Sequence, residues 1–180
     1  MKKVSYRVSL GGIIAALCLV MMFLTAVFPP LNITLPLFAG MLITVVAIEV
    51  STSWSFVTYA VVAVLSFFVT PDKEAWLFFT FFFGYYPVAK SYFEAMKSKV
   101  LCWLCKLVSF NISVVIIFYV TMNILGTIDL FEEFGFYNQW LIPGLLVFGN
   151  LIFIFYDYTL TQVIAAYKKW FRPTFLRKFK

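Results

Sequence analysis

The sequence has no histidine, and only 12% of its 180 residues are charged, about half the share found in an ordinary soluble domain. Without histidine there can be no Ser-His-Asp triad, no Cys-His pair and no histidine ligand for zinc or haem. The three cysteines, Cys18, Cys102 and Cys105, are too few for a disulfide framework. We therefore expect a protein that is not an enzyme and that carries neither a metal nor a cofactor.

Apolar residues are abundant instead. They make up 63% of the chain, with 23 Phe, 10 Tyr and 5 Trp, and the mean hydropathy is +0.97. A soluble fold of this size leaves too much surface exposed to hide so many apolar side chains, and a disordered chain has few aromatic residues. The composition therefore predicts an all-α integral membrane protein.

Six apolar stretches approach the length of about 20 residues that spans a bilayer core. They cover approximately residues 9–28, 34–50, 53–69, 75–93, 101–125 and 140–166. Only Ser51-Thr52-Ser53 separates the second stretch from the third, so one bent helix is the alternative there. Such a helix would be about 54 Å long, too long for a core of about 30 Å. We predict a single membrane domain, a compact bundle of six transmembrane helices.

The basic residues predict the orientation of this bundle. With six spans, every lysine and arginine except Lys73 falls on the side that holds both termini. Because cytoplasmic loops are enriched in Lys and Arg, the N and C termini are predicted to be cytoplasmic. The net charge of +6 then predicts attraction to anionic lipids and not to nucleic acid. The largest predicted outer loop, residues 126–139, is acidic and aromatic.

Small residues are paired on the first span. Gly11 and Ala15 are four residues apart, as are Gly12 and Ala16. Small residues at this spacing allow another helix to approach closely. They predict either a docking face for a partner protein or packing within the same bundle.

The fourth span contains Phe83-Gly84-Tyr85-Tyr86-Pro87. Pro87 cannot donate a hydrogen bond to the Phe83 carbonyl, and Gly84 loosens the same turn. A break at this depth is tolerated where the backbone faces protein or a cavity. We expect either a bend that lines a ligand pocket, with Tyr85 and Tyr86 as binding residues, or a packing kink.

Three further polar residues complete the predicted ligand-binding set. Asp72 and Glu74 lie in the short outer loop before the fourth span, where helix capping is the alternative role. Asn150 places an amide within the sixth span.

Charged residues within the spans are costly and normally form pairs or face water. Glu49, Lys90, Lys106 and Asp157 all lie toward the cytoplasmic side of the predicted bundle. Lys90 can pair with Glu49 or Glu94, and Lys106 can pair with Asp157. These residues predict structural ion pairs, or alternatively an ion or proton relay or a surface that engages a cytoplasmic partner.

A chain of this length with six spans and both ends inside resembles the substrate-binding S component of energy-coupling-factor (ECF) transporters. Gly12-Ile-Ile-Ala-Ala16 corresponds to the Ala-x-x-x-Ala docking motif of that family, from which Gly12 departs, and the segment 35–40 is similar to its second helix. The resemblance implies a bacterial plasma-membrane protein that binds a vitamin or similar micronutrient. Its implied partners are this small-molecule substrate, a transmembrane coupling subunit and ATPases.

Two other functions remain open. Cell-shape scaffolds of the MreD type have similar length, hydropathy and span number and bind no ligand. A small lipid or proton-coupled carrier is the third interpretation, and it requires the charges within the spans to be essential.

Overall fold

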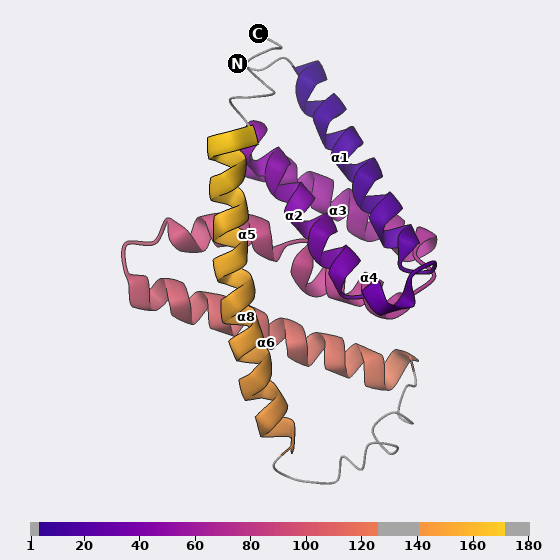
Figure 1. The fold of residues 1–180 in the computed structure, drawn as a ribbon, viewed down its shortest axis with the longest axis vertical. Coiled ribbons are helices and arrows are strands. Elements are labelled where there is room, and N and C mark those ends of the chain that lie inside the picture. The colour runs from indigo at the N-terminus through magenta and orange to yellow at the C-terminus, as the bar shows by residue number, and fades with distance from the viewer. Residues whose placement is uncertain (1–3, 126–140, 172–180) are drawn as a thin grey trace. The chain divides into compact units, whose positions relative to one another are not determined.

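A computed structural model describes residues 4–125 and 141–171, and the regular elements of these residues are helices (Figure 1). The chain divides into two compact units, Met1–Asp129 and Leu130–Lys180. Each unit is described by itself.

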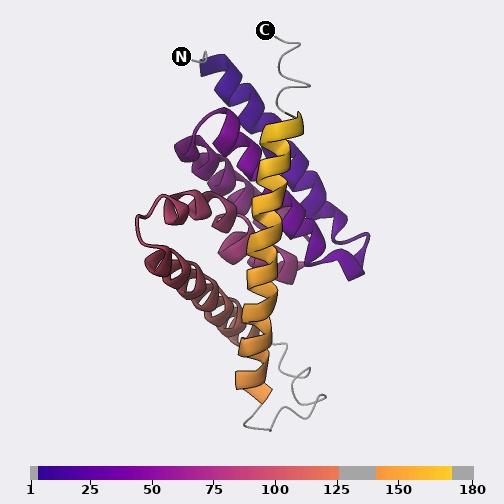
Figure 2. The same cartoon turned by 60° about the vertical axis from the view of Figure 1, so that its left-hand side comes forward.

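Three helices pack together at the centre of the first unit: α1 (Val4–Leu24), α2 (Thr34–Glu49) and α3 (Thr52–Val69). They lie side by side in both ribbon views (Figures 1 and 2). A short 3-10 turn, η1 (Pro29–Leu31), lies between α1 and α2. Buried apolar side chains from all three helices fill the space between them, including Ile14, Cys18, Met22, Ala39, Ile43, Val46 and Val62.

The helices α2 and α3 are separate, as predicted. α2 ends before Val50, and Ser51 has an extended backbone with φ −173° and ψ 161°. The Ser51 hydroxyl accepts a hydrogen bond from the Trp54 backbone N–H at 3.3 Å, an N-cap that starts α3. The two helices then pack against each other.

The fourth predicted span is interrupted. It consists of α4 (Lys73–Phe78), a π-helical turn η2 (Phe79–Phe83) and α5 (Tyr86–Glu94). The Gly84 backbone N–H donates to the Phe79 carbonyl at 2.7 Å, five residues back, which is the π-helical spacing. The predicted break at Gly84 and Pro87 is therefore confirmed.

The helix α6 (Lys99–Val120) continues into a second π-helical turn, η3 (Thr121–Leu125). Within the first unit, α6 packs chiefly against η2 and α5. Its buried residues are Lys106 and Ser113. Phe110 of α6 also packs on Phe82 at 5.3 Å, so polar and aromatic side chains together attach α6 to this unit.

The second unit contains α8 (Leu141–Ala166) and a π-helical turn, η4 (Tyr167–Phe171). The predicted outer loop 126–139 and the basic residues from Arg172 onward lie outside the described residues.

Among the described residues, four helical segments are long and apolar enough to cross a membrane. They are Val4–Leu24, Thr52–Val69, Lys99–Asn123 and Gly144–Trp170. Thr34–Glu49 is apolar but shorter, and the segment from Lys73 to Glu94 is interrupted. The all-helical fold and the four apolar spans agree with the expected class, while the six-span bundle and the side of the termini stay predictions.

Candidate functional site

The interrupted helix presents a cluster of hydroxyl groups toward α6. Tyr85 directly precedes α5, the C-terminal half of this helix, and its hydroxyl lies 2.9 Å from Ser109 Oγ and 2.7 Å from Ser113 Oγ. The Ser113 hydroxyl donates to the Ser109 carbonyl at 2.8 Å. Because the two serines are four residues apart, they lie on one face of α6. One predicted ligand residue, Tyr85, therefore joins two residues that the sequence analysis did not select.

A second tyrosine reaches the same helix from α3. The Tyr59 hydroxyl donates to the Thr80 carbonyl at 2.6 Å, and the Tyr59 ring lies edge-on to Tyr85 at 6.4 Å. In the part of the chain that the structure describes, Thr80 Oγ1 is buried without a hydrogen-bond partner. The polar atoms of Tyr59, Thr80 and Tyr85 thus gather around the break.

Tyr86 lies in different surroundings from Tyr85. It is fully buried, and its ring packs on Phe82 at 5.1 Å, whereas Tyr85 is half-buried. The two neighbouring tyrosines therefore differ in burial, and the ligand role of each stays a prediction.

The break also brings two backbones unusually close together. A Cβ added to Gly40 of α2 would lie 1.9 Å from the Phe83 carbonyl oxygen and 2.7 Å from its carbonyl carbon. Phe83 is the residue whose carbonyl loses its usual donor because Pro87 has no N–H. Gly40 allows α2 to approach this carbonyl, a contact that no other residue type permits at this position.

Residues of the short predicted outer loop form hydrogen bonds to the ends of the helices on either side of it. Asp72 Oδ1 accepts hydrogen bonds from the backbone N–H groups of Glu74 at 2.9 Å and Ala75 at 3.2 Å, so Asp72 caps α4. Lys73 Nζ donates to the carbonyls of Phe67 at 2.7 Å and Thr70 at 3.2 Å. The capping role predicted as an alternative for Asp72 is present, and a ligand role for Asp72 and Glu74 stays a prediction.

The cap on α4 can be tested by substitution. Asp72→Ala removes both acceptor bonds and is expected to destabilise the protein by about 1 kcal/mol. Faster hydrogen–deuterium exchange is expected at the Glu74 and Ala75 amides. Asp72→Asn keeps the acceptor oxygen and should have little effect, so equal losses in the two variants would contradict the capping role.

Asn150, the predicted binding residue of the sixth span, lies in α8. Its Nδ2 donates to the Leu146 carbonyl one turn earlier at 2.8 Å. This bond lies within one helix, and the predicted ligand role of Asn150 is not tested by it.

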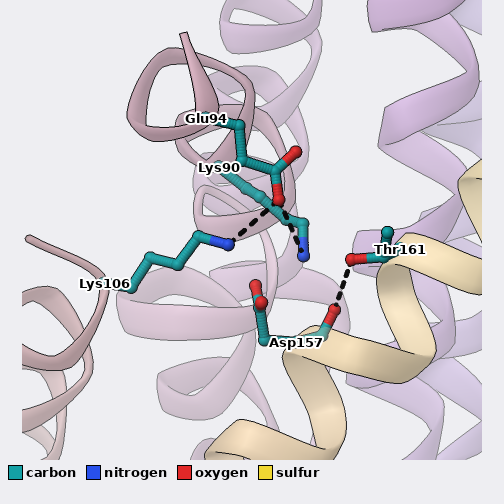
Figure 3. A network of polar contacts seen from close by, with 5 residues as sticks. All are labelled: Lys90, Glu94, Lys106, Asp157 and Thr161. Carbon is teal, nitrogen blue, oxygen red and sulfur yellow. Dashed lines mark hydrogen bonds and ion pairs between the residues drawn. The ribbon is translucent and has the colours of Figure 1, made fainter. Parts of the chain in front are cut away.

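Three charged side chains of the first unit meet at one carboxylate oxygen (Figure 3). Glu94 Oε1 lies 3.3 Å from Lys90 Nζ and 2.9 Å from Lys106 Nζ. The two lysine side chains are 1% and 5% exposed, while Glu94 is 45% exposed. Lys106 Nζ also lies 5.2 Å from the centre of the Trp103 ring. A half-exposed carboxylate therefore joins two buried ammonium groups from α5 and α6.

This arrangement confirms one predicted pair and adds another. The Lys90–Glu94 pair was expected from its i, i+4 spacing, whereas Lys106–Glu94 was not predicted. Asp157 belongs to the second unit, where its backbone carbonyl accepts a hydrogen bond from Thr161 Oγ1 at 2.9 Å. The predicted pairing of Asp157 with Lys106 stays a prediction. Glu49 is buried at the end of α2.

The small residues of α1 separate into two pairs. Gly11 is buried, and a Cβ there would lie 3.3 Å from Thr58 Oγ1 of α3. Ala15 is half-buried against the same core. Gly12 and Ala16 are exposed, and a Cβ added to Gly12 would meet nothing within 4 Å. One pair thus packs within the bundle, and the other faces outward.

Cys102 and Cys105 are half-buried free thiols. Among the residues that the structure describes, no three Cys, Asp or Glu side chains lie together in a way that could hold a metal ion.

Comparison with known proteins gave no relative. No family model, no curated protein and no solved structure matches the chain.

Proposed function

We propose that this chain is a membrane-embedded, substrate-binding subunit that docks through α1 onto a separate transmembrane subunit, in the manner of an ECF S component. The observation that carries the proposal is the open face of α1 at Gly12 and Ala16. Without a hydrophobic driving force between helices in lipid, close backbone approach at small residues is a main source of helix association. The neighbouring Gly11 already has such a contact within the bundle, which leaves the Gly12 face for a partner.

The proposal includes six spans with both termini in the cytoplasm of a bacterial cell. The basic residues beside the inner ends of the helices would then lie against anionic lipid headgroups. The substrate would be a small neutral or polar molecule, because the polar groups around the break are uncharged hydroxyls on Tyr59, Thr80, Tyr85 and Ser109. Aromatic rings beside hydroxyl groups suit an apolar ligand body with a few polar atoms.

Gly12→Val is the variant that tests docking. The added side chain should prevent close approach, so a tagged Gly12→Val protein is expected to lose a coupling subunit and its ATPases in a pull-down from the native membrane. Gly144→Val is the matched control, because Gly144 of α8 is also exposed and has open space around its Cβ position. Retention of the ATPases by the Gly12 variant, or equal loss in both variants, would contradict the docking face.

Substrate binding is tested separately with the purified protein. A thermal-shift screen against vitamins is expected to give one compound whose stabilisation grows with concentration as RT ln(1 + [L]/Kd). Partner capture without any stabilising compound would favour a scaffold. If no partner is captured and no compound stabilises the protein, the S-component proposal is wrong.

A further inference from the structure

The π-helical turn η2 takes the usual backbone donor away from one carbonyl. In a regular α-helix the Gly84 N–H would bond to the Thr80 carbonyl, four residues earlier. The Gly84 N–H donates instead to the Phe79 carbonyl at 2.7 Å. The Tyr59 hydroxyl of α3 supplies the missing proton and donates to the Thr80 carbonyl at 2.6 Å. A side chain from a neighbouring helix thus satisfies a carbonyl that would be costly to leave unpaired in lipid.

The Tyr59 ring lies directly against this turn because Gly84 has no side chain. A Cβ added to Gly84 would lie 2.6 Å from Tyr59 Cδ2 and 2.8 Å from Tyr59 Cε2. The same ring lies 6.2 Å from the ring of Phe79, the first residue of the turn. Tyr59 therefore contacts both ends of the turn from α3, while Gly40 of α2 meets it at Phe83.

Tyr85, the residue after Gly84, connects the turn to α6. The Ser113 hydroxyl donates its proton to the Ser109 carbonyl, so the Tyr85 hydroxyl is the donor in the 2.7 Å bond to Ser113 Oγ. The Ser109 hydroxyl, at 2.9 Å, then donates to the Tyr85 oxygen. Both bonds depend on where the Tyr85 oxygen lies, because hydrogen bonds weaken steeply as their geometry departs from the optimum.

We propose that Tyr59 is a positioning residue whose hydroxyl maintains the π turn and thereby places Tyr85 against Ser109 and Ser113 of α6. Without the Tyr59 proton, the Thr80 carbonyl becomes the better acceptor for the Gly84 N–H, and the turn relaxes toward α-helical spacing. That change alters the direction in which Tyr85 leaves the helix. The proposal depends neither on the docking face of α1 nor on a ligand.

Tyr59→Phe isolates the hydroxyl, because it keeps the ring and its packing on Gly84. We would place 3-fluorotyrosine at position 85 and record its ¹⁹F NMR signal in detergent micelles. Ser109→Ala combined with Ser113→Ala gives the reference signal of a Tyr85 hydroxyl that has lost both partners on α6. Tyr59→Phe is expected to move the parent signal toward this reference.

Tyr92→Phe is the matched control for the ¹⁹F measurement. It removes the same hydroxyl from a residue of α5 that is 52% exposed, and it should leave the signal at position 85 unchanged. A parent-like signal in Tyr59→Phe would overturn the proposal, and so would an equal displacement in Tyr92→Phe.

A double-mutant cycle tests the same link through stability. Tyr59 and Ser113 lie on different helices and their hydroxyls donate to different carbonyls, so independent roles would give additive losses. The positioning role predicts that Ser113→Ala lowers the midpoint of SDS unfolding much less in the Tyr59→Phe background than in the parent chain. Additive shifts of the midpoint would contradict it.

Discussion

Gly40→Ala is expected to lower the free energy of unfolding by about 3 kcal/mol, at the upper end of the cost of overpacking. The new methyl group would lie 1.9 Å from the Phe83 carbonyl oxygen, well inside any tolerated contact. Because the obstructing atoms belong to a backbone, no rotamer change can relieve the clash, and α2 must move away from the interrupted helix. The loss can be measured by SDS-titrated unfolding in mixed micelles.

Gly12→Ala is the control for this prediction. It makes the same chemical change in a helix, at a position where the added carbon meets nothing within 4 Å. It should be as stable as the parent chain or more stable by up to about 1 kcal/mol, because Ala favours a helix interior over Gly. If Gly40→Ala unfolds at the same SDS fraction as Gly12→Ala, that result contradicts the close contact between Gly40 of α2 and the Phe83 carbonyl.

Glu94→Gln is expected to cost about 2 kcal/mol. Breaking a buried ion pair costs about 3–5 kcal/mol because the remaining charge stays buried, and the 45% exposure of Glu94 reduces that figure through solvent screening. The two ammonium groups of Lys90 and Lys106 would keep their mutual repulsion and lose the carboxylate that they share. The midpoint of SDS unfolding gives the loss, with Glu74→Gln as the same change at the other end of the interrupted helix.

A double-mutant cycle separates the ion pair from a general effect of the substitution. Lys106→Met combined with Glu94→Gln should be less destabilising than the sum of the two single changes, because the two side chains contact each other at 2.9 Å and residues in contact are not additive. Strict additivity would mean that Lys106 and Glu94 do not interact.

Much of the helical organisation was predictable because it depends on local chemistry. The polar interruption at Ser51-Thr52-Ser53 and the length of a bilayer core separated α2 from α3, and Pro87 with Gly84 located the break. The Lys90–Glu94 pair followed from one turn of helix. Each of these features involves residues within a few positions of one another in the chain.

The contacts that define the candidate site were not predictable in this way. Tyr59 meets Thr80 across 21 residues, and Gly40 meets Phe83 from another helix. Ser109 and Ser113 carried a usable signal, since two serines one turn apart mark a polar stripe on an apolar span. Tyr59 carried none, because a single tyrosine in an apolar helix does not indicate which neighbour its hydroxyl reaches.

Gly11 and Gly12 show why the buried face of a helix that is apolar on all sides is hard to predict from its sequence. Successive residues lie about 100° apart around a helix, so one of the two must point away from the other's neighbours. In a soluble helix a polar face would show which side is buried. α1 is apolar on all sides. Only the contact of Gly11 with Thr58 shows that Gly11 is buried and that Gly12 is exposed.

The polar attachment of α6 has a consequence for the order of assembly. A helix that is apolar along most of its surface is already stable once it has entered the bilayer, before it meets any neighbour. Ser113 and Lys106 then fix its place by recognising Tyr85 and Glu94. Insertion and positioning of α6 are thus separate events, the first encoded by its many apolar residues and the second by the few residues that contact the interrupted helix, Ser109 among them.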